Sequence, residues 1–355
     1  MYAVVKTHRG SGAEVKEVDV PKIGNKDVLV KVKAAAICGT DVHIWNWDTW
    51  AQNVIKVPVI FGHECAGEVV EVGRDVTSVS VGDYISPEGH LADTTCYQCR
   101  TGKMHICKSI KGLGVARDGI FAEYVALPEL NIWQNDQDLD PYLASIQDPL
   151  GNAVHAVLPM NCPEDMAGAY VAVLGCGPVG LMSIAVAKTL GASMIIATAG
   201  GSNLVRMKMA EEMGADLVLD AGGSDGSVVK DVLEVTKGRG VDVVLEMSGA
   251  ESAIKQAFEM LTPGGRVSLL GFPKGPVTLD LNNLVIYKYA RVYGIYGRRM
   301  FETWYQMKGL LRLPEFRSKM ASLITHKLPI KDIGEGMELI NSKKAVKVAL
   351  EPKWT

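Results

Sequence analysis

One glycine-rich run constrains the fold of this chain more than any other feature: Gly175-Cys176-Gly177-Pro178-Val179-Gly180. It follows the apolar stretch 170–174 and precedes an apolar-periodic stretch over 179–190. A glycine loop between a strand and a helix is the context in which this spacing predicts a nucleotide-binding turn rather than an ordinary bend.

Each residue of the loop has an expected role. Gly175 permits the tight turn, Gly177 allows phosphates to approach the backbone, and Gly180 lets helix and strand pack closely. Pro178 and Val179 begin the helix, whose N-terminus attracts the pyrophosphate. The loop therefore predicts a bound dinucleotide.

The same rhythm of apolar strand and amphipathic helix continues along the chain. Further strands are predicted at 194–198, 217–220, 241–247, 266–271 and 291–295, and further helices at 203–213 and 251–261. Six strands joined by helical crossovers predict an α/β fold with a doubly wound parallel sheet, the Rossmann arrangement.

The first part of the chain has a different pattern. Short Val- and Gly-rich segments, such as 28–33 and 66–73, alternate with turn residues, which is typical of a barrel-like all-β domain. A chain of 355 residues is also longer than a domain with a single hydrophobic core usually is. We predict a catalytic domain at 1–150, completed by 298–355 and including a helix over 300–311, and a dinucleotide-binding domain at 151–297.

Composition narrows the function classes. With 37 basic and 40 acidic residues the formal charge is -3. This balance lacks the excess of positive charge that binding to nucleic acid or to an anionic membrane requires, so we expect a small-molecule substrate. The chain shows neither a signal peptide nor an apolar run of about 18 residues, which predicts a cytoplasmic protein without a membrane span. Seven cysteines, an odd number, favour metal binding or burial over disulfides.

The end of the second predicted strand departs from the usual dinucleotide pattern. An acidic residue normally stands there to bind the adenosine ribose, but residues 194–203 contain none. Ser202, Asn203 and Arg206 instead offer donors that suit a 2'-phosphate. The sequence favours NADP(H), and NAD held by backbone groups or Ser202 stays open.

Three residues of the first domain form a candidate catalytic metal site. Cys38, His63 and Glu64 each lie in a strand-to-turn context with a glycine nearby. A thiolate, an imidazole and a carboxylate suit zinc, which in catalytic sites takes three protein ligands and keeps one exchangeable position.

A second candidate metal site lies in a compact lobe, Asp93-x2-Cys96-x2-Cys99-x7-Cys107. Carboxylate oxygen can bind zinc, so these four residues predict a structural zinc, bound more weakly than by four thiolates. His90 or His105 could substitute as a ligand, and a lobe that holds its shape without metal is the alternative.

These motifs resemble a known family. The run Gly62-His63-Glu64-x2-Gly67-x5-Gly73 is the signature of zinc-containing medium-chain dehydrogenases, and the whole chain is similar to them. More narrowly, four runs resemble the L-threonine 3-dehydrogenase branch: 37–48, 148–155, 246–250 and 294–298, the last continuing into 301–305. The resemblance implies a GroES-like catalytic domain, bound Zn²⁺ and NAD or NADP, and a homotetramer.

The resemblance also implies residue roles. Cys38 and His63 are zinc ligands, with Glu64 and Asp148 as carboxylates at or next to the metal; Asp148 stands where the family often has Glu. Thr40 and His43 match the family's proton relay, which a secondary alcohol needs because zinc lowers its pKa only part of the way.

The remaining assignments concern nicotinamide and substrate. The nicotinamide is expected beside Ser248, Gly249, Gly271 and Ile295, while His90 borders the substrate and Arg298 binds its carboxylate or the cofactor. The predicted reaction is oxidation of the L-threonine 3-hydroxyl to L-2-amino-3-oxobutanoate. A polyol, sorbitol or 2,3-butanediol dehydrogenase is the alternative, and a nucleotide-binding protein without dehydrogenase activity is a different class.

Overall fold

The computed structural model describes residues 1–200, 203–222 and 227–354. The chain forms two compact units. The first comprises Met1–Asp148 and Ile324–Thr355, and the second Pro149–Leu323. Each unit has a hydrophobic core of its own.

The first unit is built around a seven-stranded sheet with the order β10-β6-β5-β3-β18-β17, and β9 also pairs with β3. Its strands are β3 (Asp27–Ala36), β5 (Glu64–Val72), β6 (Tyr84–Pro87), β9 (Tyr124–Pro128), β10 (Ile132–Gln134), β17 (Ile324–Pro329) and β18 (Lys347–Glu351). Two smaller sheets contain β1 (Tyr2–Lys6), β2 (Glu14–Glu17) and β4 (Val59–Ile60), and β7 (His90–Leu91) and β8 (Lys111–Gly112).

The longest strand shows why these segments form a sheet. Along β3 the side chains of Val28, Val30 and Val32 are buried, whereas Lys31 and Lys33 are exposed. This period of two buries one face of the strand in the core and leaves the charged side chains in water. The GroES-like all-β prediction for this region is confirmed.

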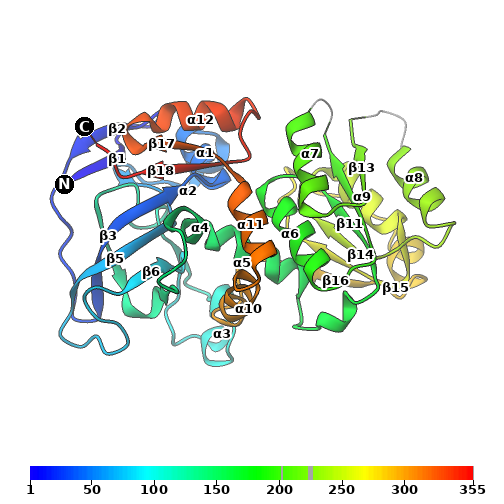
Figure 1. Ribbon diagram of the computed structural model, residues 1–355, viewed down its shortest axis with the longest axis horizontal. Helices are drawn as coiled ribbons and strands as arrows, with labels where there is room; N and C mark the ends of the chain where they lie inside the picture. The colour runs from blue at the N-terminus through cyan, green and yellow to red at the C-terminus, as the bar shows by residue number, and fades with distance from the viewer. Residues whose placement is uncertain (201–202, 223–226, 355) are drawn as a thin grey trace. The chain divides into compact units, whose positions relative to one another are not determined.

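The helices of the first unit are short. They are α1 (Gly39–Asn46), α2 (Thr49–Val54), α3 (Tyr97–Arg100), α4 (Pro141–Ser145) and α12 (Ile333–Asn341), and α5 (Gln147–Val157) begins at the unit's boundary. In Figure 1, α12 lies along β17 and β18, with which it is in contact.

The second unit contains a six-stranded, all-parallel sheet with the order β13-β12-β11-β14-β15-β16. The strands are β11 (Tyr170–Leu174), β12 (Met194–Ala199), β13 (Leu217–Asp220), β14 (Val241–Glu246), β15 (Leu261–Leu269) and β16 (Arg291–Gly294). This is the doubly wound order 3-2-1-4-5-6, so the predicted Rossmann fold is confirmed. All six predicted strands are present, although β15 begins earlier than expected.

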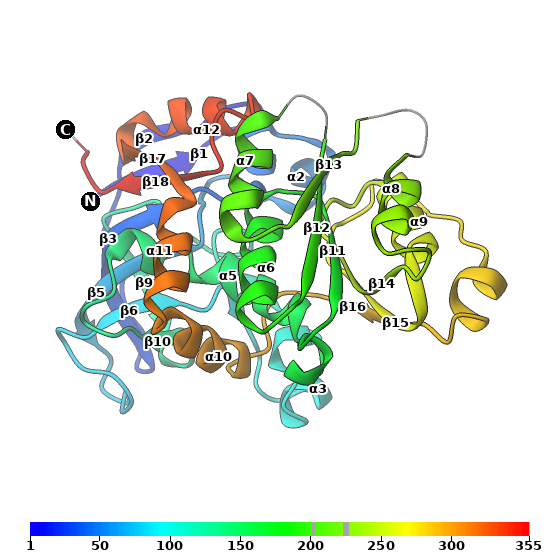
Figure 2. The same cartoon turned by 45° about the vertical axis from the view of Figure 1, so that its right-hand side comes forward.

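Helices cover both faces of this sheet. Figure 2 shows α6 (Pro178–Thr189) and α7 (Leu204–Met213) on one side, and α8 (Ser227–Val235) and α9 (Glu251–Glu259) on the other. Helix α8 was not among the predicted helices; its buried Val228 and Val232, four residues apart, face the core.

The C-terminal boundary requires a correction. The sequence placed all of 298–355 with the first domain, but α10 (Glu302–Leu311) and α11 (Pro314–Ser322) belong to the second unit. Helix α11 packs on α6, and Arg299 donates to the carbonyl of Leu158 at 3.0 Å. Only residues from Ile324 onward return to the first sheet.

No helix among the described residues combines the length and the apolar character needed to cross a membrane.

Candidate functional site

The pairing of β3 with β5 brings the candidate metal ligands together. Ala36 lies opposite Glu64 in the antiparallel register, so Cys38 continues from one strand beside the start of the other. The ligand atoms of Cys38, His63 and Glu64 lie within 4.8 Å of one another. The structure thus places side by side the three residues that the sequence singled out, and their role as zinc ligands stays a prediction.

Two further charged residues, neither of them expected from the sequence, lie beside the cluster. Lys347, on β18, places its Nζ 2.5 Å from Glu64 Oε2 and donates to the carbonyl of Ile37 at 2.8 Å. Asp41, fully buried in α1, accepts from the Cys38 amide at 2.8 Å through Oδ2. Its Oδ1 lies 3.8 Å from His63 Nδ1.

Burial and neighbouring charges shift the pKa values in this cluster. Burial raises the pKa of both Glu64 and Asp41, an effect that the nearby cations Lys347 and His63 oppose. Burial lowers the pKa of His63, but the charges of Cys38 and Asp41 outweigh it and leave the pKa well above its usual value. Acidic groups thus outnumber basic ones in a desolvated space.

The cluster fits a divalent cation. Neither Glu64 Oε1 nor Oε2 accepts an aligned hydrogen bond from any described residue, although Lys347 lies close to Oε2. Buried carboxylate oxygens without donors are costly unless a cation compensates them. A thiolate, an imidazole and a carboxylate form a donor set that zinc accepts.

The candidate relay residues lie on α1, which begins directly after Cys38. Thr40 and His43 are three residues apart and share one face of the helix. Thr40 Oγ1 lies 3.9 Å from Cys38 Sγ. His43 is exposed, and its Nδ1 contacts a carboxylate oxygen of Asp48, a residue that the sequence analysis did not single out.

The other candidate substrate and carboxylate residues are placed as follows. Asp148, in the first turn of α5, is buried and its charge acts on Glu64, but it is not part of the group of three ligands. His90 pairs through Nδ1 with Glu88 Oε1 at 3.0 Å. In the second unit, Arg298 is buried rather than solvated at the surface and donates to Asn152 Oδ1 at 3.2 Å.

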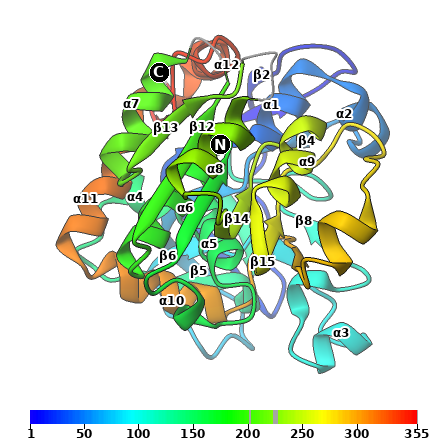
Figure 3. The same ribbon diagram turned by 90° about the vertical axis from the view of Figure 1, so that its right-hand side faces the viewer.

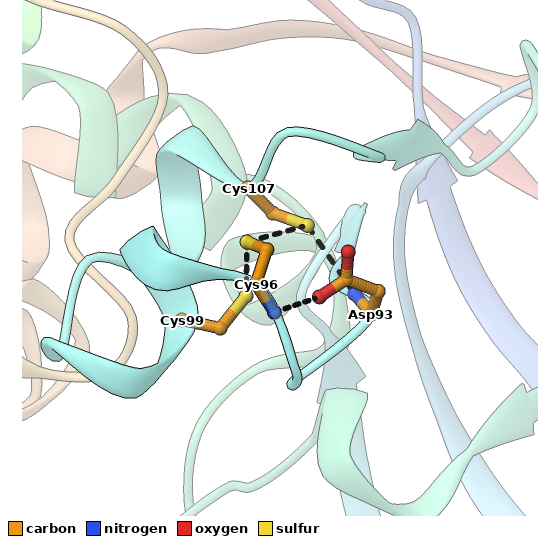
Figure 4. A group of neighbouring side chains, drawn as sticks. All are labelled: Asp93, Cys96, Cys99 and Cys107. Carbon is orange, nitrogen blue, oxygen red and sulfur yellow. Dashed lines mark hydrogen bonds between the residues drawn. The ribbon is translucent and has the colours of Figure 1, made fainter.

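The second cluster is a lobe around α3, drawn in cyan in Figure 3. Figure 4 shows Asp93, Cys96, Cys99 and Cys107 directed toward one another, and their ligand atoms lie within 4.8 Å. Asp93 Oδ1 accepts from the amides of Cys96 and Thr95, which holds the pKa of this carboxyl well below its usual range.

The spacing of the sulfurs fits a tetrahedral zinc. With zinc–sulfur bonds of about 2.3 Å, neighbouring sulfurs lie about 3.8 Å apart. Cys96 Sγ lies 3.5 Å from Cys99 Sγ and 3.8 Å from Cys107 Sγ. The amides of Asp93 and Ser109 point at Cys107 Sγ from 3.3 and 3.4 Å, as donors to a thiolate do. His105 is buried outside this group of four.

The glycine loop connects β11 with α6 as predicted. Gly175 has a φ of +108°, which other residues rarely adopt. A Cβ at Gly180 would lie 2.0 Å from the Gly175 carbonyl oxygen, whereas a Cβ at Gly177 would meet no atom within 4 Å. Gly180 therefore serves helix packing, and Gly177 leaves open space at the N-terminus of α6, where Pro178 is followed by Val179.

A buried glutamate organises the loops at the carboxyl ends of β14 and β15. Glu246 Oε1 accepts from the amides of Ser248 and Gly249, at 2.8 and 3.0 Å. A Cβ at Gly271 would lie 2.0 Å from the Gly249 amide nitrogen, so these turns pack backbone to backbone. Ile295 follows β16 and is buried. Glu246 begins the run 246–250 that resembles the family, but no role for its side chain was predicted from the sequence.

The adenosine side of the fold contains the candidate residues Asn203 and Arg206 at the start of α7. Asn203 Oδ1 accepts from the Arg206 amide at 3.2 Å and caps the helix. Ser202, the third candidate, lies outside the described residues.

Two family models match the chain. Residues 24–137 match the alcohol dehydrogenase GroES-like domain, and residues 178–312 match the zinc-binding dehydrogenase domain. An L-threonine 3-dehydrogenase of Bacillus velezensis is 47% identical over 352 residues, which cover 99% of each chain.

Solved structures are similar over the whole length. The 2R,3R-butanediol dehydrogenase of Bacillus subtilis has a TM-score of 0.87 at 29% identity, covering 99% of this chain and 100% of that one. A structure from Sinorhizobium meliloti 1021, described as a zinc-binding dehydrogenase bound to NADP, has a TM-score of 0.87 at 28% identity, covering 99% of both chains.

The two loop glycines give a prediction with an internal control. Gly180→Ala should lower the free energy of unfolding by about 1–3 kcal/mol because its Cβ overlaps a carbonyl oxygen. Gly177→Ala should keep the wild-type melting temperature but weaken dinucleotide binding at least about tenfold, since the methyl occupies the space for phosphates. Thermal unfolding and NAD(P)H fluorescence titration measure these effects; equal behaviour of the two variants would contradict the assignment.

Proposed function

The chain belongs to the zinc-binding alcohol dehydrogenase family, and from this premise we propose that it oxidises the secondary alcohol of L-threonine to L-2-amino-3-oxobutanoate. One hydride passes to C4 of the nicotinamide of NAD⁺ or NADP⁺, and one proton is released. The observation that carries the proposal is the cluster of Cys38, His63 and Glu64, with Thr40 and His43 on the adjacent helix α1. The chain is also 47% identical over 352 residues to an L-threonine 3-dehydrogenase.

We assign the catalytic zinc to Cys38, His63 and Glu64, with Asp148 as a carboxylate beside it. When bound, the metal acts as a Lewis acid that lowers the pKa of the substrate hydroxyl. Asp93, Cys96, Cys99 and Cys107 are assigned to a structural zinc that stiffens their lobe.

The chain's own residues would carry the proton away. Thr40 accepts it from the substrate hydroxyl at Oγ1 and passes it toward His43. With Nδ1–H held by the Asp48 carboxylate, the His43 Nε2 is the acceptor, and the exposed ring delivers the proton to water. Asp48 is thus a positioning residue for His43.

Substrate selection follows from charge. The carboxylates Glu64 and Asp148 favour a substrate that carries an ammonium group. His90, oriented by Glu88, is proposed to border the substrate. Arg298 is proposed to bind the substrate carboxylate or the cofactor.

The proposal extends to assembly and compartment. All seven cysteines are free, which suits the reducing cytoplasm. We propose a homotetramer, supported by the edge strand β16 and by exposed apolar side chains near it: Leu281, Ile286, Tyr287, Tyr289 and Val292. Light scattering coupled to size exclusion measures the mass directly.

Initial rates with L-threonine, 2,3-butanediol and sorbitol, each with NAD⁺ and NADP⁺, test the function. We expect the highest kcat/KM for L-threonine with at least one cofactor. A higher value for butanediol or sorbitol would replace threonine by a diol or polyol, and no turnover in a zinc-loaded protein would indicate a nucleotide-binding protein without this activity.

Paired substitutions separate the two metal sites. Cys38→Ser should lower the zinc content from two ions per chain to one and abolish turnover while the protein stays folded. Cys107→Ser should also remove one zinc but should mainly lower the melting temperature, because it opens the structural lobe. Metal analysis, calorimetry and initial rates give the three readouts; retained turnover in Cys38→Ser would refute the catalytic assignment.

One substitution can separate the two roles of Asp48, which positions His43 and caps α2. Asp48 Oδ1 caps α2 by accepting from the Ala51 amide at 3.0 Å, and asparagine retains this oxygen. Asp48→Asn should therefore keep the melting temperature but lower kcat by about tenfold to a hundredfold, with KM for threonine unchanged and an altered pH profile. A normal kcat and pH profile would show that His43 does not depend on this contact.

A further inference from the structure

The carboxyl end of β12 lacks the group that holds the ribose of NAD. The strand ends in Thr198 and Ala199, both buried, followed by Gly200. A carboxylate at this place would accept hydrogen bonds from the ribose hydroxyls and would repel a 2'-phosphate. These three residues do neither.

The start of α7, which follows, offers donors instead. Asn203 uses Oδ1 to cap the helix, and its amide nitrogen Nδ2 is buried with no hydrogen-bond partner among the described residues. Arg206 Nε, one turn along, is likewise buried and without a partner there. Buried donors that lack acceptors cost free energy, so a bound acceptor would compensate both.

Arg206 also lies near the glycine loop. Burial raises the pKa of the Cys176 thiol to about 12, and the charge of Arg206 opposes this shift, so the guanidinium acts on the loop that receives the pyrophosphate. Burial lowers the pKa of Arg206 itself, and the nearby Cys176 opposes this shift.

One carboxylate near the end of β12 could bind the ribose in place of the missing acidic residue. Asp220 ends β13 directly opposite Ala199 in the parallel register. It is exposed, and its Oδ1 accepts from the Gly222 amide at 2.7 Å. Asp220 is therefore the alternative group for a ribose hydroxyl and has to be included in any test.

We infer that Asn203 Nδ2 and Arg206 form a subsite for the 2'-phosphate of the cofactor, so that the chain uses NADP(H) in preference to NAD(H). The inference rests on the proposed function, whose reaction leaves the choice between the two cofactors open. The phosphate oxygens accept from the amide and from the guanidinium.

Binding measurements test the subsite without turnover. Calorimetric titration of the full-length protein with NADPH, NADH, 2',5'-ADP and 5'-AMP should give a Kd at least about tenfold lower for each 2'-phosphorylated member of a pair. Rising salt should weaken NADPH more than NADH, because the extra charge is screened.

Substitutions at the two residues sharpen the test. Asn203→Asp keeps an oxygen that caps α7 but replaces the Nδ2 donor by a negative charge, so it should weaken NADPH and 2',5'-ADP at least about tenfold and reverse the preference. Arg206→Gln should weaken the same two ligands, and Arg206→Lys should retain part of the preference. Lys208→Ala, at an exposed position of the same helix, is the control and should change nothing.

Three outcomes would overturn the inference. These are tighter binding of NADH than of NADPH by the wild type, equal weakening of both cofactors by Asn203→Asp, and loss of NADH affinity in Asp220→Asn, which would assign the ribose to Asp220. Each leaves threonine oxidation with NAD⁺ intact. Absence of binding by either dinucleotide would instead refute the proposed function as well.

Discussion

The site depends on the antiparallel pairing of β3 with β5 and of β18 with β3. The first ladder sets Ala36 opposite Glu64, and the second sets Ala36 opposite Ala349, two residues after Lys347. Three segments that are far apart in the sequence thereby deliver a thiol, an imidazole, a carboxylate and an ammonium group into one buried space. A one-residue slip in either ladder would turn these side chains to the opposite face of the sheet.

This arrangement has an energetic consequence. Glu64 and Lys347 are both almost fully buried, so each charge needs the other and a further compensating charge. Removing one member of a buried ion pair costs about 3–5 kcal/mol because the remaining charge has no partner. The excess of acidic groups around His63 means that Lys347 alone does not balance the cluster, whereas a divalent cation held by Cys38, His63 and Glu64 does.

Much of the fold and of the candidate metal site was predictable from the sequence. The inner strands β11, β12 and β14 are largely apolar runs with mostly buried side chains, as buried parallel strands require. Cys38, His63 and Glu64 were found because their chemistry is rare in combination. Lys347 was not, because a lysine side chain among apolar residues is normally expected to reach water, and only the structure shows that it is buried together with Val348, Ala349 and Leu350. The assignment of 298–323 failed for a similar reason: the packing of α11 on α6 is a tertiary contact that helical periodicity does not encode.

The residues that depart from common local patterns are the most informative about the cofactor. Strand β12 obeys every rule of a buried parallel strand until its last residues, where small and neutral side chains replace the expected carboxylate. At the start of α7, Asn203 caps the helix with its Oδ1, while its Nδ2 has no hydrogen-bond partner among the described residues. The missing acidic residue could be recognised from the sequence, but the donors without partners among the described residues could not. A helix-capping asparagine has the same sequence context whether or not its Nδ2 donates a hydrogen bond. A polar group left unpaired beside a binding loop is explained most simply by a ligand that completes it.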